Sequence, residues 1–251
     1  MVREREAVGE PILLAISGAE GRMGRSLRAL LQDDARFRLV ACVNRSDAWS
    51  GVPALDVVID FSTPAGFDAA LAHCRAQRVA FVSGTTGLDA AQCEAAGAAA
   101  HEIPVLRASN FSLGVAVLAR LVREAAAALP DWDLEILEAH HARKLDAPSG
   151  TALALGRSAA AARGQDFSKV AVLSREGQVG ARTAGAIGFA SIRAGDIVGE
   201  HTVLLAGTGE RVELTHRAAD RSIFARGALH AAAWIAGKRP GAYALDDVLR
   251  T

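Results

Sequence analysis

Residues 12–31 have the sequence ILLAISGAEGRMGRSLRALL, in which three evenly spaced glycines join a short aliphatic run to a helical pattern. Gly18 permits a tight turn, Gly21 lets a pyrophosphate approach the backbone, and Gly24 lets helix and strand pack closely. Backbone N–H groups at the start of the helix then face the phosphates. The spacing predicts a dinucleotide site, and a glycine-rich turn without a ligand is the alternative.

The chain after this turn alternates between aliphatic runs and helical patterns. Nearly continuous β-branched runs separated by helices predict a parallel sheet covered on both faces. Asn44–Leu55 leaves no room for a helix, so we expect a loop or one short turn there. Ser62 or Thr63 before Pro64 is a typical helix start. Strands are predicted at 38–43, 56–62, 79–84 and 103–109, and helices at 23–31, 64–75 and 89–100.

The second half of the chain has a different pattern. Its strands are grouped together, which predicts a mixed or antiparallel sheet and a second domain of α+β type. The predicted strands are 133–141 and segments near 170–174, 185–193, 200–206 and 210–216, and the predicted helices are 112–129, 149–163 and 223–235.

The composition excludes several classes of protein. The 251 residues include 28 basic and 28 acidic side chains, so neither a nucleic acid nor a membrane is expected as a partner. Hydrophobic residues at 51% exclude a disordered chain. Three cysteines without C-x-x-C spacing exclude a disulfide framework and a four-thiolate metal site. The charged first residues, MVREREAVGEP, lack the apolar run of a signal peptide, and we expect a soluble cytoplasmic protein.

The end of the second predicted strand bears on the choice of coenzyme. Nucleotide-binding folds usually have an acid there for the ribose hydroxyls, but this chain has Asn44 and Arg45. A 2′-phosphate then meets no repulsion, and an arginine can pair with it. We therefore predict that NADPH is used at least as well as NADH. A solvated loop arginine is the alternative interpretation of Arg45.

Residues 138–152, EAHHARKLDAPSGTA, form the most specific stretch. They place two histidines and Lys144 at the end of a strand and just before a helix start. The stretch combines a proton donor near neutral pH, a fixed cation and the N–H groups of a helix N-terminus. This combination suits a small anionic substrate that must accept a proton.

Other interpretations of these residues exist. A lone histidine is more often structural than catalytic, and His140 and His141 point to opposite faces in an extended strand, which argues against a zinc site. Lysine is rare in this chain, with only Lys144, Lys169 and Lys238. A lysine in this segment is therefore less typical of a generic surface charge.

The segment 138–152 matches the signature E-A-H-H-x-x-K-x-D-A-P-S-G-T-A throughout. On this evidence the sequence resembles the 4-hydroxy-tetrahydrodipicolinate reductase family, also called dihydrodipicolinate reductase. The resemblance covers nearly the whole chain, with further matches at 18–24, 83–87, 108–114, 174–177, 187–201 and 215–228.

The resemblance implies an α/β protein with a Rossmann-type dinucleotide-binding domain, residues 1–111 and 221–251. A central α+β domain with a mixed sheet, residues 112–220, would bind substrate and build a homotetramer. NADPH or NADH would reduce a small cyclic dicarboxylate in lysine biosynthesis through diaminopimelate, without a metal. His140 would be the acid/base, Lys144 a second proton donor or charge stabiliser, and His141, Gly150 and Thr151 the carboxylate ligands. The implied coenzyme contacts are Gly18, Ala19, Glu20, Gly21, Arg22, Met23, Arg45, Gly84, Thr85, Thr86, Ala108, Ser109, Asn110 and Phe111.

The sequence departs from the family pattern at a few positions. Glu20 replaces a small residue, and we expect its side chain to point to solvent. Asn44 replaces a common acid, and Ser109 conservatively replaces an alanine. Two other functions stay open: another two-domain Rossmann dehydrogenase, and a nucleotide-sensing protein without turnover.

Overall fold

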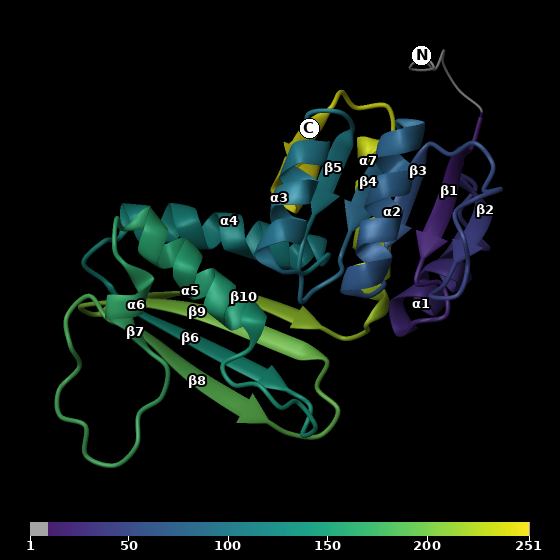
Figure 1. Cartoon of the computed structure of the whole chain (residues 1–251). Coiled ribbons are helices and arrows are strands. Elements are labelled where there is room, and N and C mark those ends of the chain that lie inside the picture. Colours follow the sequence, from purple (N-terminus) through teal and green to yellow (C-terminus); the bar gives the residue numbers. More distant parts are fainter. Residues whose placement is uncertain (1–9, 251) are drawn as a thin grey trace. The chain divides into compact units, whose positions relative to one another are not determined.

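The strand before the glycine-rich turn lies inside a six-stranded parallel sheet in the computed structural model, which describes residues 10–250. The expectation about a signal peptide falls mainly on residues 1–9, which lie outside the described part. The chain forms two compact units: one contains the residues up to Leu113 and those from Ser222 onward, and the other contains Gly114–Arg221. Figure 1 labels their helices and strands.

The parallel sheet of the first unit has the strand order β11-β5-β4-β3-β1-β2. Its middle strands are buried on both faces, and Leu14, Ile16 and Ile59 have no exposed surface. This burial explains why these strands are continuously aliphatic rather than alternating. The strands are β1 (Ile12–Ser17), β2 (Phe37–Val43), β3 (Val57–Asp60), β4 (Ala80–Ser83), β5 (Pro104–Arg107) and β11 (Gly241–Tyr243).

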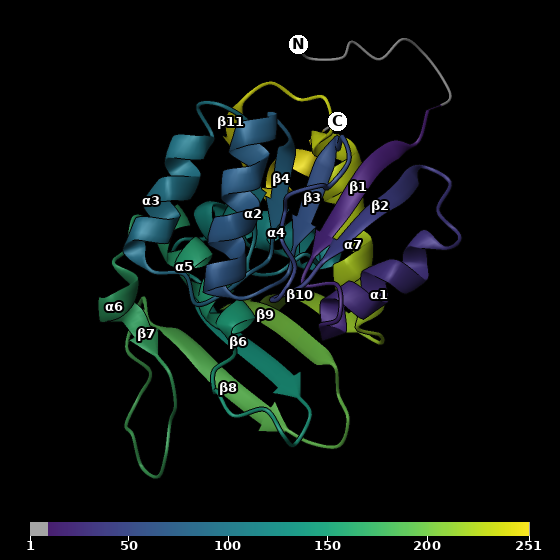
Figure 2. The ribbon, with the colours of Figure 1, turned by 45° about the vertical axis from the view of Figure 1, so that its right-hand side comes forward.

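Helices cover both faces of this sheet. One face packs against α2 and α3 through a cluster that includes Phe67, Phe81 and Val105. The helix α7 contacts α1 and the strands β3, β4 and β5; in Figure 2, α2 and α3 lie in front of the sheet and α7 behind it. The helices of this unit are α1 (Arg22–Leu31), α2 (Pro64–Gln77), α3 (Ala90–Ala99), α7 (Ser222–Ile235) and α8 (Leu245–Val248).

The helix starts follow from local chemistry. Thr63 accepts a hydrogen bond from the Gly66 N–H at the start of α2, with Pro64 in the first turn, as the sequence predicts. Asp89 and Gln92 cap α3 reciprocally. Residues 44–55 contain no helix or strand, which confirms the predicted loop.

The second unit has a five-stranded mixed sheet with the order β10-β9-β6-β8-β7. Its strands are β6 (Asp133–His140), β7 (Ala171–Val172), β8 (Ile187–Arg193), β9 (Gly199–Gly207) and β10 (Glu210–Ala218), and its helices are α4 (Leu113–Ala128), α5 (Gly150–Ala162) and α6 (Phe167–Val170). Leu118 and Leu155 from α4 and α5 pack on Leu134 and Ile136 of β6. The two helices therefore share one face of the sheet, as Figure 1 shows.

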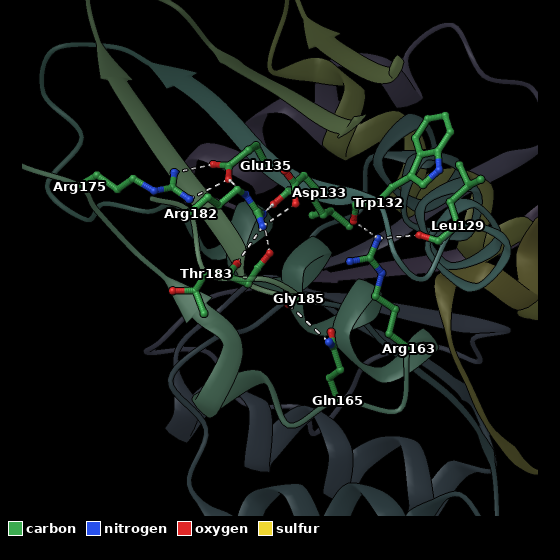
Figure 3. Close-up of polar contacts among 12 residues, drawn as sticks. Leu129, Trp132, Asp133, Glu135, Arg163, Gln165, Arg175, Arg182, Thr183 and Gly185 are labelled. Atoms are coloured by element: carbon green, nitrogen blue, oxygen red, sulfur yellow. Dashed lines mark hydrogen bonds and ion pairs between the residues drawn. The ribbon is translucent and has the colours of Figure 1, made fainter. Parts of the chain in front are cut away.

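The opposite face of this sheet holds the long segment between β7 and β8. Glu135 receives two hydrogen bonds from Arg175, at 2.7 and 2.8 Å, and one from Arg182 at 3.1 Å (Figure 3). Burial raises the pKa of Glu135, but these two arginines outweigh it and hold the pKa below its ordinary value. The segment is thus anchored to β6 by charge-assisted hydrogen bonds.

Two findings complete the fold class. The predicted α/β class with a second, mixed sheet is confirmed. Among residues 10–250, no helix combines the length and apolar character that crossing a bilayer requires.

Candidate functional site

The glycine-rich turn has the close backbone packing that its spacing predicts. Gly18 has a φ of +79°, and a Cβ there would lie 2.5 Å from the carbonyl oxygen of Phe61. A Cβ on Gly24 would lie 2.3 Å from the Gly18 carbonyl oxygen. At the start of α1, Gly21 provides no side-chain cap. The first turn of α1 therefore offers N–H groups to an anion, and the backbone packing around it leaves no room for a side chain at Gly18 or Gly24.

A cavity of about 400 Å³ lies beside this turn. Its lining includes the predicted coenzyme residues Gly18, Glu20, Gly21 and Arg45. Ala19 is buried beneath the turn, and Ala19, Arg22 and Met23 do not line the cavity. Glu20 is exposed and also lines the cavity, so the expected direction of its side chain stays a prediction. The residues present fit a dinucleotide, because the cavity reaches from the glycine turn to the end of β2.

The other predicted coenzyme contacts follow β4 and β5. Thr85, Thr86, Ala108 and Ser109 line a second cavity of about 450 Å³, and Gly84 lies beside it in sequence. The Asn110 side chain accepts a hydrogen bond from the Ser112 N–H at 2.8 Å. Phe111 is buried against Phe61, with ring centroids 5.4 Å apart. Open α/β sheets bind ligands at this carboxyl edge.

Asp60 is a residue of this edge that the sequence reasoning missed. Its carboxylate is fully buried and accepts hydrogen bonds from the hydroxyls of Ser62, Ser83 and Thr85, at 2.5, 2.8 and 2.7 Å. It therefore ties the loop after β3 to the loop after β4. The sequence signal was an acid at the end of a buried strand with hydroxyl residues after both strands.

The second unit brings His140 against two charged residues. Nδ1 of His140 lies 2.5 Å from Oε2 of Glu138, and both side chains lie on the same face of β6. Arg193 on β8 donates to both oxygens of Glu138, at 2.7 and 2.9 Å. Burial raises the pKa of Glu138, but hydrogen bonds from Arg193, Ser191 and His140 outweigh it and lower the pKa to about 2. Glu138 is thus a fixed anion at neutral pH.

Hydrogen bonds connect Lys144 to the same cluster. Its Nζ lies 2.8 Å from Oδ1 of Asp146, and the Asp146 carbonyl accepts from Arg193 at 2.6 Å. The chain of contacts from Lys144 through Asp146, Arg193 and Glu138 ends at His140. The structure therefore links the two predicted proton donors through one hydrogen-bonded network.

The predicted carboxylate ligands lie around the same loop. Gly150 and Thr151 are the first two residues of α5, and the Ser149 hydroxyl caps this helix by accepting from the Ala152 N–H. Nδ1 of His141 is buried without a hydrogen-bond partner among the described residues. Burial and the nearby cations Arg221 and Arg143 lower the pKa of His141. His141 is therefore a neutral hydrogen-bonding group at neutral pH.

His201 on β9 completes the cluster. Its Nε2 lies 3.0 Å from the Ser149 hydroxyl, and its ring meets the His140 ring edge-on with centroids 5.2 Å apart. Burial and the neighbouring His140 lower the pKa of His201 to about 4. Sequence reasoning assigned no role to Glu138, Arg193, His201 or Ser149. The contacts that bring them together, Glu138 with Arg193 and Ser149 with His201, join residues more than 50 positions apart. Among residues 10–250, no group of three or more His, Cys, Asp or Glu side chains is arranged to hold a metal ion.

These two sites divide the chemistry of a reduction between them. The first unit has the cradle for a dinucleotide, and the second gathers the predicted proton donors and carboxylate ligands. A chain of this kind belongs to the class of NAD(P)-dependent oxidoreductases, in which the coenzyme supplies hydride and the protein supplies binding, orientation and protons.

Comparison with known proteins identifies the family. The family model described as "Dihydrodipicolinate reductase, N-terminus" matches residues 12–111, and "Dihydrodipicolinate reductase, C-terminus" matches residues 114–249. The chain belongs to this family. The 4-hydroxy-tetrahydrodipicolinate reductase of Alkalilimnicola ehrlichii is 48% identical, over 94% of this chain and 98% of that protein. The Caulobacter vibrioides enzyme of the same name is 46% identical, over 96% of this chain and 98% of the relative.

Solved structures agree with the family assignment. The dipicolinate-bound dihydrodipicolinate reductase from Paenisporosarcina sp. TG-14 is 26% identical, with a TM-score of 0.77, over 95% of this chain and 99% of that chain. GenD2 from gentamicin A biosynthesis, in complex with NAD, is 16% identical with a TM-score of 0.59, over 99% of this chain and 93% of that chain. That second likeness concerns the fold alone.

Proposed function

We propose that the chain reduces 4-hydroxy-tetrahydrodipicolinate to tetrahydrodipicolinate with NADPH or NADH, in the diaminopimelate route to lysine. The observation that carries the proposal is the His140–Glu138–Arg193 cluster with Lys144 inside the family signature 138–152. The names of relatives that cover nearly the full chain support the same reaction. The Paenisporosarcina structure, described as dipicolinate-bound, supports a cyclic dicarboxylate as substrate.

The first unit would bind the coenzyme. Gly18, Gly21 and the start of α1 would receive the pyrophosphate, and Arg45, which lines the same cavity, would lie near the adenosine. The predicted contacts at 84–86 and 108–111 lie at the carboxyl edge of the sheet, on the nicotinamide side. When bound, NAD(P)H supplies the hydride. Asp60 keeps the loops after β3 and β4 in place through its three hydroxyl donors.

In the second unit, His140 would act as the acid that protonates the reduced ring. The Glu138 carboxylate accepts the hydrogen bond of Nδ1–H, so Nε2 is the nitrogen that would donate the proton to the substrate. Glu138 also stabilises the positive charge of the imidazolium before the proton is given up. Lys144, held by Asp146, supplies a second positive charge or proton.

His141, Gly150 and Thr151 would bind the carboxylates of the substrate. Anions are stabilised at a helix N-terminus by the helix dipole and the backbone N–H groups. The buried Nδ1 of His141 has no protein partner among residues 10–250, which leaves it available to a ligand. A neutral imidazole serves as a hydrogen-bond donor here without adding a full charge.

The second unit would also form the contacts of a cytoplasmic homotetramer. Leu137 and Ile192 project from the sheet face opposite α4 and α5, and they are 39% and 53% exposed. Exposed aliphatic residues on a sheet face that no helix covers are typical of a contact between subunits. The anchored segment between β7 and β8 lies on this same face.

The decisive experiment measures oxidation of NADPH and NADH with freshly prepared 4-hydroxy-tetrahydrodipicolinate. Rapid, substrate-dependent oxidation is expected. Turnover only with a sugar, aldehyde or amino acid would identify another two-domain dehydrogenase. Tight coenzyme binding without oxidation of any substrate would identify a nucleotide sensor.

A further inference from the structure

The end of β2 lacks the acid that nucleotide-binding folds usually have there, since Asn44 occupies the position. The structure brings a carboxylate to this place from three residues further on. Oδ2 of Asp47 accepts hydrogen bonds from the backbone N–H of Asn44 at 2.7 Å and from its side-chain Nδ2 at 3.2 Å. The Asp47 carboxylate is therefore fixed at the strand end by two donors.

Asn44 connects this carboxylate to the glycine-rich turn. Because its Nδ2 donates to Asp47, its Oδ1 points to the Glu20 N–H and accepts a hydrogen bond from it at 3.0 Å. Asp47 thus belongs to the same rigid frame as the predicted pyrophosphate site. A loop that is held at both ends places its charge more reproducibly than a free side chain does.

The cavity around Asp47 has the walls of an adenosine site. Asp47, Arg45 and Trp49 line the same cavity as Gly18 and Gly21. The Trp49 indole is stacked on the His73 ring, with centroids 4.5 Å apart. This stack holds the indole in place as an apolar wall of the cavity. The carboxylate is thus in the cavity that holds both the phosphate-binding turn and an aromatic wall.

We propose that Asp47 is the residue that sets coenzyme preference, by binding the adenosine ribose hydroxyls of NADH and opposing the 2′-phosphate of NADPH. Arg45 has the opposite effect, because its guanidinium can pair with a 2′-phosphate. The inference rests on the proposed coenzyme role of this cavity. With Asp47 and Arg45 in one cavity the chain can bind both coenzymes, and loss of either charge shifts the preference between NADH and NADPH.

The test uses the dissociation constants of NADH and NADPH, measured from the fluorescence of the reduced nicotinamide on titration with the full chain. Asp47→Asn removes the charge but keeps an acceptor for the Asn44 N–H, and Asp47→Ser is a second, smaller replacement. Asp33→Asn is the matched control, because Asp33 is exposed in the same unit and does not line the cavity. Arg45→Ala tests the opposing charge.

Asp47→Asn and Asp47→Ser should raise the ratio of the NADH dissociation constant to the NADPH dissociation constant by about tenfold. This is the scale expected for removing a like charge near a phosphate. Asp33→Asn should leave this ratio unchanged, and Arg45→Ala should weaken the binding of NADPH more than the binding of NADH. An unchanged ratio in both Asp47 variants, with normal substrate turnover, would overturn this inference alone. Failure of the wild-type chain to bind either nucleotide would overturn the proposed coenzyme role as well.

Discussion

Nδ1 of His140 lies 2.5 Å from Oε2 of Glu138, and the same carboxylate accepts two hydrogen bonds from Arg193. The arrangement fixes the imidazole tautomer and its ring orientation. Since Glu138 lies two residues before His140 on β6, the strand geometry places both side chains on one face. The pair is therefore built into the strand, and only Arg193 has to come from a neighbouring strand.

Replacing Glu138 by Gln should lower kcat by about 10²-fold, because the imidazolium loses its counter-charge. The loss should fall on kcat with little change in the KM of the substrate, because the proposed carboxylate ligands are retained. Coenzyme affinity should be unchanged, since Glu138 belongs to the second unit. Steady-state kinetics and a fluorescence titration with NADPH measure these effects.

Glu210→Gln is the control for this variant, because Glu210 is exposed at the start of β10, away from the cluster. It should behave like the wild-type chain. A Glu138→Gln variant with an unchanged kcat would exclude Glu138 as a positioning residue for His140.

A substitution at Gly199 tests whether the position of the His140 imidazole matters for catalysis. A Cβ added there would lie 3.1 Å from Nε2 of His140, closer than ordinary contact. We expect Gly199→Ala to lower kcat by about tenfold or more, because small displacements of a reacting group are costly. Gly97→Ala is the control, since a Cβ on Gly97 meets nothing within 4 Å. Equal kcat values for the two variants would show that Nε2 is not the reacting nitrogen.

His140→Ala and Lys144→Ala should each lower turnover by about 10²-fold or more, as expected for loss of a proton donor. Both variants should still bind NADPH, because the coenzyme residues belong to the other unit. Lys169→Ala removes a lysine whose side chain is 80% exposed, and it should leave kcat and KM at wild-type values. Full activity in the His140 or Lys144 variant would exclude that residue from the mechanism.

Much of the fold could be predicted because its signals are local. The aliphatic runs, the glycine spacing and Thr63-Pro64 each specify one element within a few residues. The short strand β11 (Gly241–Tyr243) was not predicted, because three residues carry no periodicity and β11 forms only by pairing with β5. The addition of α7 to the first unit depends on long-range packing, which residues 222–235 do not encode by themselves.

The candidate site was predictable only in part, for the same reason. Residues 138–152 carry His140 and Lys144 in one contiguous signature. Arg193 and His201 contribute through strands that pair with β6, so their roles depend on register rather than on local sequence. Asp47 lies three residues beyond the strand-end position where nucleotide-binding folds usually have the ribose acid, so the strand-end pattern did not predict it.

A charge on the sheet face that no helix covers should disrupt the proposed tetramer. Ile192→Asp places a carboxylate in an exposed aliphatic position, where burial against another subunit would be costly. Light scattering coupled to size-exclusion chromatography should show smaller species. Thr208→Asp is the control, because Thr208 is an exposed polar residue in the turn between β9 and β10. A tetramer of unchanged stability in the Ile192 variant would place the contact elsewhere.

The buried His201 should make the folded chain less stable in mild acid. Its pKa is about 4 in the folded state because burial and His140 disfavour the charged form, whereas an unfolded histidine titrates near 6.5. The unfolded state therefore binds more protons between these values, and stability must fall as the pH drops from about 6.5 to about 4. The loss at pH 4 relative to pH 7 is about 3 kcal/mol from this residue. Urea unfolding of the wild type and His201→Gln should show a smaller pH dependence in the variant. Equal slopes over this range would mean that His201 is protonated in the folded chain.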